Sequence, residues 1–407
     1  MKQETIIDRS TSVTLNITAG KIDSYRKNEE TTGTVRVYRD GKIGVAGMLG
    51  EPDEKALTRR AEEALAIGIP YPETKDDPLT RAELHSPEIL PEKELLPTMQ
   101  ALLDRVTEAC PRFAVSNKIT LAKRSRDYRS SDGRILSWAD RALSVALVFQ
   151  DRGAGNLMDG FFEYTGRDFC PDRIVERCRE FHDAFYTKAD IEEGELPVVF
   201  SFPELFYCTL RHFMGELYAS GASLVSGKLG EKIFSERMTL SVDRNRETVC
   251  CEPFFDDEGC TAKDDRVPLI EAGVLRNLGV NKKNAAQFGL PVSGTAYEAA
   301  YDGVPTVNGI PAFHLAPTAK TLAELVPGRA IFVNMASGGD MTPDGHFATP
   351  VQGAFLMEAG RLVGRLPEVN VSGDFFTLFG QDYLGSVIGD PDPNAAYCAM
   401  NMNVKKA

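Results

Sequence analysis

Residues 201–237 constrain the fold more strongly than any other part of the chain. Pro203 is suited to the first turn of a helix, where the N–H that proline lacks would have no hydrogen-bond partner within the helix. A run of small residues and glycines begins at Ala219 and indicates where the helix ends. We therefore predict a helix over about 203–219, at the centre of a C-terminal domain. Its buried face is formed by apolar residues at helical spacing, namely Phe206, Leu210, Phe213, Met214 and Leu217.

The N-terminal half is patterned as a half-buried antiparallel sheet, because apolar and polar residues alternate along it. Asp40-Gly41 marks a hairpin turn. Residues 70–91, rich in proline and acidic side chains, are interpreted as a surface connection, and the basic residues 123–126 as a solvated strand edge. Strands are expected over 11–18, 22–30, 34–38, 43–48, 115–128, 134–139, 143–150 and 157–165, and helices over 53–68 (capped by Asp53 and stopped by Gly68), 97–109 and 171–185.

The second half is rich in short strands, and two of its hairpins turn at the same Glu-Ala-Gly sequence, at 271–273 and 358–360. A glycine there supplies the positive φ that a tight hairpin needs. The acidic linker 190–195 marks the domain boundary. We predict an α+β fold, with an N-terminal domain of antiparallel sheet plus helices over 1–190. A C-terminal curved or barrel-like antiparallel β domain, wrapped around the central helix, is expected over 191–407.

Composition excludes some classes of function. The 407 residues carry a formal net charge of −13, which argues against direct binding to nucleic acid, because a phosphate backbone needs a basic surface. The eight cysteines form no CxxC pair and are expected to be reduced thiols of a cytoplasmic protein. No apolar run has the length of a signal-peptide core or of a membrane span, so we predict neither export by that route nor a membrane partner.

The residues alone leave the chemistry open. The acidic run Asp256-Asp257-Glu258 offers oxygen ligands for a divalent cation, but it lacks the spacing of a calcium loop and is more typical of a solvated turn. His212 on the central helix has no second histidine at zinc-motif spacing, and a single ligand does not hold zinc. His346 lies in a glycine-rich loop, which makes it a candidate for lining a cleft.

Several longer segments resemble the TldD/PmbA family, whose members were once called modulators of DNA gyrase. The resemblance covers nearly the whole chain. Its most specific part is DDEG followed by LIEAGVL and AAQFG. The segments that carry it are VRVYRDGKIGVAGM at 35–48, SGKLGEKIF at 226–234, FFDDEGC at 254–260, VPLIEAGVLRNLGVNKKNAAQFGLPVSGTA at 267–296, FVNMASGG at 332–339 and TPVQGAFLMEAGRLVG at 349–364.

The family implies paired cytoplasmic proteins. One branch, TldD, carries an HExxxH zinc motif on the helix before the SGxxGE run, and the other, TldE/PmbA, has the same fold without it. The motif's first His, its Glu and its second His fall here on Phe206, Tyr207 and Arg211, so the chain resembles the TldE/PmbA branch. TldD also implies a cysteine ligand near the C-terminus. Cys398 lies close to that position, but Ala399 replaces the family's glycine, and we expect a structural thiol.

From this resemblance we expect a non-catalytic subunit of a TldD–TldE-type zinc metallopeptidase that cleaves unfolded or extended peptides. The zinc is expected in the TldD-type partner and no metal in this chain, which forms a homo- or heteromeric dimer. Two alternatives stay open: a homo-oligomeric peptide-binding scaffold without catalysis, and a free-standing hydrolase with an unrecognised site. The residues expected to line the cleft are Arg211, His212, Asp256, Asp257, Glu258, His346 and Cys398.

Overall fold

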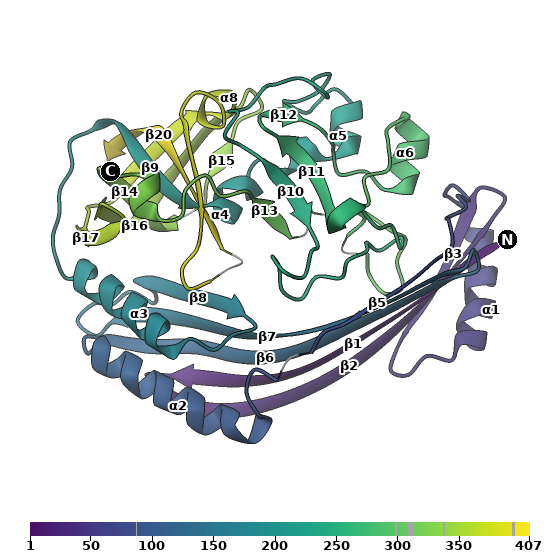
Figure 1. The fold of residues 1–407 in the computed structure, drawn as a ribbon, viewed down its shortest axis with the longest axis horizontal. Coiled ribbons are helices and arrows are strands. Elements are labelled where there is room, and N and C mark those ends of the chain that lie inside the picture. The colour runs from purple at the N-terminus through teal and green to yellow at the C-terminus, as the bar shows by residue number, and fades with distance from the viewer. Residues whose placement is uncertain (87, 298, 308, 310–311, 337, 393–394) are drawn as a thin grey trace.

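The computed structural model describes residues 1–407 apart from 87, 298, 308, 310, 311, 337, 393 and 394. Its N-terminal half is a long, curved, mostly antiparallel sheet that runs beneath the C-terminal half (Figure 1). The strand order is β4-β3-β2-β1-β6-β7-β5, and β8 also pairs with β7. The strands are β1 (Lys2–Thr18), β2 (Lys21–Arg39), β3 (Lys42–Leu49), β4 (Ile69–Pro70), β5 (Leu79–Leu84), β6 (Phe113–Ser130), β7 (Arg134–Asp151) and β8 (Gly160–Gly166).

Three helices pack against this sheet. α1 (Glu54–Ala64) begins at Asp53, whose side chain accepts a backbone N–H of the first turn at 3.1 Å. The 3₁₀ turn that follows α1 ends at Gly68, where φ is +80°, so both predicted ends are confirmed. α2 (Glu92–Ala109) and α3 (Pro171–Phe185) lie at the left-hand end of the sheet in Figure 1 and share with it a large buried apolar cluster.

The strands of this sheet are longer than their local patterns predict. The stretches 22–30 and 34–38 belong to the single strand β2, and 134–139 and 143–150 belong to β7, because pairing with neighbouring strands continues through the residues between them. Residues 70–91 are not only a surface connection. They contain β5, which runs parallel to β7.

The C-terminal half contains a closed five-stranded barrel, which confirms the predicted barrel-like sheet. The ring runs β14-β9-β20-β18-β16 and closes through the pairing of β16 with β14. Only the β14–β9 pair of this ring is parallel. The barrel strands are β9 (Gly194–Ser201), β14 (Arg329–Ala336), β16 (His346–Glu358), β18 (Val369–Asp374) and β20 (Ala396–Lys406). The elements beside it are β15 (Asp340–Met341), β17 (Arg361–Arg365), β19 (Tyr383–Ile388), α7 (Leu322–Leu325) and α8 (Phe375–Leu378).

The predicted central helix over 203–219 is wrong as a single element. The segment divides into α4 (Phe202–Tyr207), a 3₁₀ turn (Leu210–Phe213) and α5 (Gly215–Ala219). Long-range pairing breaks the helix: the Gly279 N–H donates to the Phe213 carbonyl at 2.8 Å, and the Gly215 N–H donates to the Gly279 carbonyl at 2.9 Å. Local spacing cannot reveal a partner so far away in the chain.

A four-stranded sheet, in the order β12-β11-β10-β13, packs on the other side of this broken segment. α4 contacts β9 and β20 of the barrel, and Phe206 contacts Phe313 of β13, so the segment lies between two sheets and is not enclosed by one. α6 (Lys282–Phe288) follows this sheet, and the side chain of Asn281 caps its first turn by accepting the Asn284 N–H at 2.8 Å. The strands are β10 (Leu240–Asp243), β11 (Arg266–Glu271), β12 (Val274–Leu275) and β13 (Phe313–Leu315).

Two expectations from composition can be compared with the structure. All eight cysteines are free thiols. Among the described residues no helix combines the length and the apolar character that crossing a membrane requires. The division of the chain at residue 190 stays a prediction.

The two Glu-Ala-Gly turns have the backbone that their glycines predict. Gly273 and Gly360 have φ of +80° and +77°, and the preceding Ala272 and Ala359 also lie in the left-handed region, at +46° and +45°. Two consecutive residues with positive φ match the right-handed twist of the strands that they join.

We predict that Gly273→Ala lowers the free energy of unfolding by about 3 kcal/mol, against about 1 kcal/mol for Gly41→Ala. Both glycines have positive φ, but a Cβ at 273 overlaps the carbonyl oxygen of Phe234, whereas one at 41 meets open space. Urea unfolding of the two variants measures the difference. Equal losses would show that steric overlap contributes nothing at 273.

Candidate functional site

The three positions that match the zinc motif point in different directions. Phe206 is fully buried, with its ring centroid 5.2 Å from that of Phe213 and 4.6 Å from that of Phe313. Tyr207 is 73% exposed, and Arg211 is also exposed. The break after α4 separates Phe206 from Arg211, so side chains at these two positions do not converge on one point. In this chain the three positions therefore form no common site.

His212 is buried beside the broken helix. Its Nδ1 accepts the N–H of Leu224 at 3.2 Å, which places the ring hydrogen on Nε2, and Nε2 has no hydrogen-bond partner among the described residues. The hydroxyl of Ser223 donates to the His212 carbonyl at 2.6 Å. Burial, together with the charge of Arg211, lowers the pKa of His212 to about 4. At neutral pH the ring is therefore an uncharged packing residue that fixes the 223–224 turn.

The other two single candidates lie apart from each other. Cys398 is fully buried on β20, with its Sγ 3.9 Å from the Phe200 carbonyl oxygen, and burial raises the pKa of its thiol. His346 is exposed at the start of β16, where its N–H donates to the Thr342 hydroxyl at 3.0 Å. Neither residue belongs to a group of three possible metal ligands in the described part of the chain.

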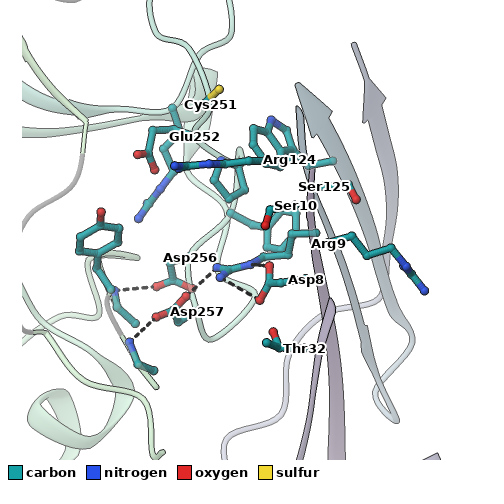
Figure 2. Close-up of a pocket in the computed structure, with 18 of the residues that line it drawn as sticks. Asp8, Arg9, Ser10, Thr32, Arg124, Ser125, Cys251, Glu252, Asp256 and Asp257 are labelled. Atoms are coloured by element: carbon teal, nitrogen blue, oxygen red, sulfur yellow. Dashed lines mark hydrogen bonds and ion pairs between the residues drawn. The ribbon is translucent and has the colours of Figure 1, made fainter. Parts of the chain in front are cut away.

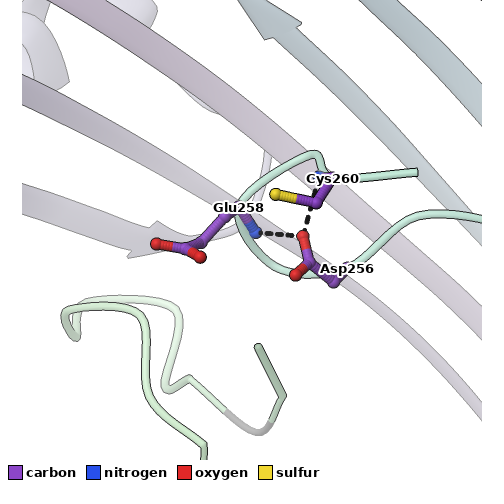
Figure 3. A group of neighbouring side chains, drawn as sticks. All are labelled: Asp256, Glu258 and Cys260. Atoms are coloured by element: carbon purple, nitrogen blue, oxygen red, sulfur yellow. Dashed lines mark hydrogen bonds between the residues drawn. The ribbon is translucent and has the colours of Figure 1, made fainter. Parts of the chain in front are cut away.

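The acidic run is buried, so its prediction as a solvated turn is wrong. Asp256 is 2% exposed and Glu258 is fully buried. One oxygen of Asp256 accepts the N–H groups of Glu258 and Cys260, at 2.9 and 2.8 Å, and the other accepts that of Ala296 at 3.1 Å. Figure 3 shows the loop folded around this carboxylate. Asp256 thus serves as the internal acceptor that the loop's backbone donors require.

Glu258 connects the loop to α6 and to the N-terminal half. One oxygen accepts the hydroxyl of Tyr71, and the other accepts the N–H of Lys282 at 2.9 Å. The ammonium of Lys282 lies 3.3 Å from the Glu258 carbonyl oxygen and 2.9 Å from a carboxylate oxygen of Asp76. Burial and the charge of Asp256 raise the pKa of Glu258 to about 7, against the opposing effects of Lys282 and Tyr71.

Asp257 connects the loop to the long sheet. Its carboxylate accepts the Arg126 guanidinium at 2.6 Å and the Ala299 N–H at 3.0 Å, and its carbonyl accepts Arg36. Arg126 also pairs with Asp8 of β1 at 2.6 Å. β6 lies between β1 and β7, so the prediction that residues 123–126 form a strand edge is wrong, although Lys123 and Arg124 are solvent-exposed as predicted. Arg126 instead bridges the two halves of the chain.

Two cavities flank the acidic loop. One, of about 240 Å³, lies between the long sheet and the loop; Figure 2 shows Asp8, Ser10 and Ser125 on its sheet side and Glu252 on its loop side. The other, of about 500 Å³, lies around Cys260, Lys282 and Asp76. Of the predicted cleft residues, the structure brings only Asp256, Asp257 and Glu258 together; Arg211, His212, His346 and Cys398 lie elsewhere in the described fold.

Two models of one family match the chain. The PmbA/TldA metallopeptidase domain 1 matches residues 4–68, and the PmbA/TldA metallopeptidase C-terminal domain matches residues 193–385. Together they span more than half of the sequence. The chain belongs to the PmbA/TldD family.

Its similarity to individual proteins agrees with the PmbA/TldD assignment. A metalloprotease of Methanothermobacter thermautotrophicus is 24% identical over 397 residues, which cover 90% of this chain and 84% of that protein. A zinc metalloprotease TldD homologue of Saccharolobus solfataricus is 22% identical over 218 residues, 51% of this chain and 47% of that protein. The fold matches that of TldE from Thermococcus kodakarensis with a TM-score of 0.80 at 19% identity, over 99% of this chain and 96% of that one.

Because a PmbA/TldD relative is a zinc metalloprotease, we tested whether this chain's residues fit a metal. In the described residues, one group of three possible ligands has its atoms within 4.8 Å of one another: Asp256, Glu258 and Cys260 (Figure 3). Both carboxylates already accept hydrogen bonds on both oxygens. Burial and Asp256 raise the pKa of the Cys260 thiol, and the Lys282 ammonium adds positive charge beside the group. These residues do not fit a zinc site.

The partners of the acidic loop were not found from the sequence. Arg126 and Tyr71 lie 131 and 187 positions from the acids that they bind. One signal was present: Phe254 and Phe255 precede the acidic run, and apolar neighbours indicate burial. Buried carboxylates require buried donors or cations, but the sequence does not say which ones.

Proposed function

We propose that this chain is the TldE-like, non-catalytic subunit of a cytoplasmic zinc metallopeptidase complex that cleaves unfolded or extended peptides. The observation that carries the proposal is the divergence at the motif positions, with Phe206 in the core and Tyr207 and Arg211 at the surface. The zinc, its bound water and the general base then come from a TldD-type partner. The fold shared with TldE of Thermococcus kodakarensis supports this assignment.

The long sheet offers a surface on which an extended peptide can pair. β5 is an outermost strand of the described sheet, and it pairs with β7 along one edge. Its side chains alternate between half-buried and exposed, as in a strand with one solvated face. A peptide added along the other edge would gain backbone hydrogen bonds that make few demands on its sequence. We propose this mode of binding for unfolded substrates.

The test is zinc content and peptide cleavage, measured on the purified chain alone and after mixing with a TldD-type partner. We expect no stoichiometric zinc and no cleavage from this chain alone, and both from the mixture. As a matched control, replacing the glutamate of the partner's HExxxH motif by glutamine should abolish cleavage while the complex still forms. Stoichiometric zinc in the isolated chain would overturn the proposal, and so would a mixture in which the two chains do not associate.

A further inference from the structure

The cavity of about 240 Å³ between the long sheet and the acidic loop contains two arginines that form no ion pair within the described part of the chain. Arg124 comes from β6, and Arg244 follows β10. Arg244 is 5% exposed, and in the described residues its one side-chain hydrogen bond runs from Nη1 to the Gly294 carbonyl at 2.5 Å. Arg124 makes no side-chain hydrogen bond or ion pair within the described part of the chain. Most of the N–H donors of both guanidinium groups therefore remain available.

The acids deep in this cavity are already satisfied by the protein. Asp256 accepts three backbone N–H groups, Asp257 accepts Arg126 and the Ala299 N–H, and Asp8 accepts Arg126. None of these carboxylates is hydrogen-bonded to Arg124 or Arg244, although the charge of Arg244 acts on Asp256. Figure 2 shows the Asp8 and Asp257 contacts closing one side of the cavity.

Two further acids line the cavity. Glu30 is exposed to solvent, where its charge is screened. Glu252 is half-buried, and burial raises its pKa while the charges of Arg244 and Arg124 lower it. One half-buried carboxylate thus faces two guanidinium groups, of which that of Arg124 is solvent-exposed. Five carboxylates and four guanidinium groups line the whole cavity, so anion binding there depends on the unused donors of Arg124 and Arg244 and not on a net positive charge.

The remaining wall is apolar. Trp138 on β7 is 5% exposed and lines the cavity together with Pro253 and Phe255. A buried indole face provides a large contact area for a hydrocarbon side chain. The volume is below the roughly 300–1,000 Å³ of pockets that enclose a whole drug-sized ligand. The cavity therefore suits the end of a chain better than a length of it.

We propose that this cavity binds the C-terminal carboxylate of a peptide whose last side chain is apolar, with Arg124 and Arg244 holding the carboxylate and Trp138 contacting the side chain. A planar carboxylate matches the guanidinium fork. A phosphate dianion is disfavoured, because the carboxylates of Glu252, Asp256 and Asp257 line the same cavity. Only the identity of the ligand as a substrate peptide rests on the proposed function; the carboxylate site rests on the cavity itself.

Trp138 is the only tryptophan in the chain, so its fluorescence reports directly on this cavity. We would titrate the isolated, metal-free chain with N-acetylglycylleucine, with its C-terminal amide, and with inorganic phosphate. The free acid should give a saturable change in emission, and the amide should bind at least about tenfold more weakly, because it loses the charge-assisted hydrogen bonds. Equal binding of acid and amide, or tighter binding of phosphate, would overturn the proposal.

Three variants refine the test. Arg124→Gln should weaken binding of the acid about tenfold, whereas Lys123→Gln, which removes the same charge from the neighbouring position on the opposite face of β6, should leave it unchanged. Glu252→Gln should tighten binding, because it removes a carboxylate that competes for the arginines. Equal effects of the 123 and 124 variants would contradict the site. The fluorescence titration uses neither zinc nor the partner chain. A failure of the cleavage experiment therefore does not affect the titration result, and a failure of the titration does not affect the cleavage result.

Discussion

Asp256→Ala should lower the free energy of unfolding by about 4 kcal/mol, the largest loss that we expect from one substitution in the acidic loop. The carboxylate accepts the N–H groups of Glu258, Cys260 and Ala296, all within 3.1 Å, and it is 2% exposed. Alanine leaves these three donors buried without an acceptor, and each lost hydrogen bond to a charged group costs roughly 1.5–3 kcal/mol before the loop relaxes. The shift in the urea unfolding curve measures the loss.

Two further variants make this result specific. Asp302→Ala removes an exposed acid with no hydrogen-bond partner among the described residues, and should change stability by less than about 0.5 kcal/mol. Asp256→Asn keeps one carbonyl oxygen as an acceptor but places an NH₂ group against another N–H, so its loss should fall between the two. If Asp256→Ala were as stable as Asp302→Ala, water would have to replace the carboxylate, and the loop would not be the tightly packed joint described above.

The features that the sequence predicts correctly are those decided within a few residues. The Asp53 cap, the Gly68 stop and the positive φ of Gly273 and Gly360 each follow from steric and hydrogen-bonding rules that act over one turn. The bounds of α3 are also predicted, since proline at its start and apolar periodicity are local signals. The barrel is anticipated as an architecture, although its closure depends on the pairing of β14 with β16.

The predictions that are wrong concern features that depend on contacts between segments far apart in the sequence. The broken central helix depends on Gly279, which hydrogen-bonds on both sides of the break. The basic residues around Arg126 and the acidic run around Asp257 are both typical of solvated charge when each is considered alone. In the structure Arg126 and Asp257 form an ion pair, and each charge compensates for the burial of the other. The sequence shows that both charges are present, but it does not show that they form an ion pair.

The candidate site shows the same division. The loss of the zinc motif is visible in the sequence as Phe206, Tyr207 and Arg211, but their divergence in space is not. The cavity beside the acidic loop has no motif at all, because Arg124 and Arg244 come from separate sheets. Such a site consists of guanidinium N–H groups that have no acceptor in the folded protein. Only a structure shows which N–H groups these are.

The stability of the wild-type protein should fall by roughly 3 kcal/mol, relative to Glu258→Gln, as the pH rises from about 4.5 to about 8. The folded protein raises the pKa of Glu258 from 4.5 to about 7, through burial and then Asp256. Between these values the folded state holds a proton that the unfolded state has released, so stability falls with rising pH. The contribution of Glu258 to stability is fully present below its pKa in the unfolded state, and it is lost as the pH rises through its pKa in the folded state.

The hydrogen bonds of Glu258 are compatible with a protonated carboxyl group. When Glu258 is protonated it can donate to the Tyr71 hydroxyl, which reverses their hydrogen bond, while the other oxygen still accepts the Lys282 N–H at 2.9 Å. Glutamine has the same shape and does not titrate, so any constant cost of the substitution cancels when the two pH profiles are subtracted. Parallel profiles would mean that the Lys282 ammonium and the Tyr71 hydroxyl outweigh burial, and that the joint between the two halves keeps both Asp256 and Glu258 ionised.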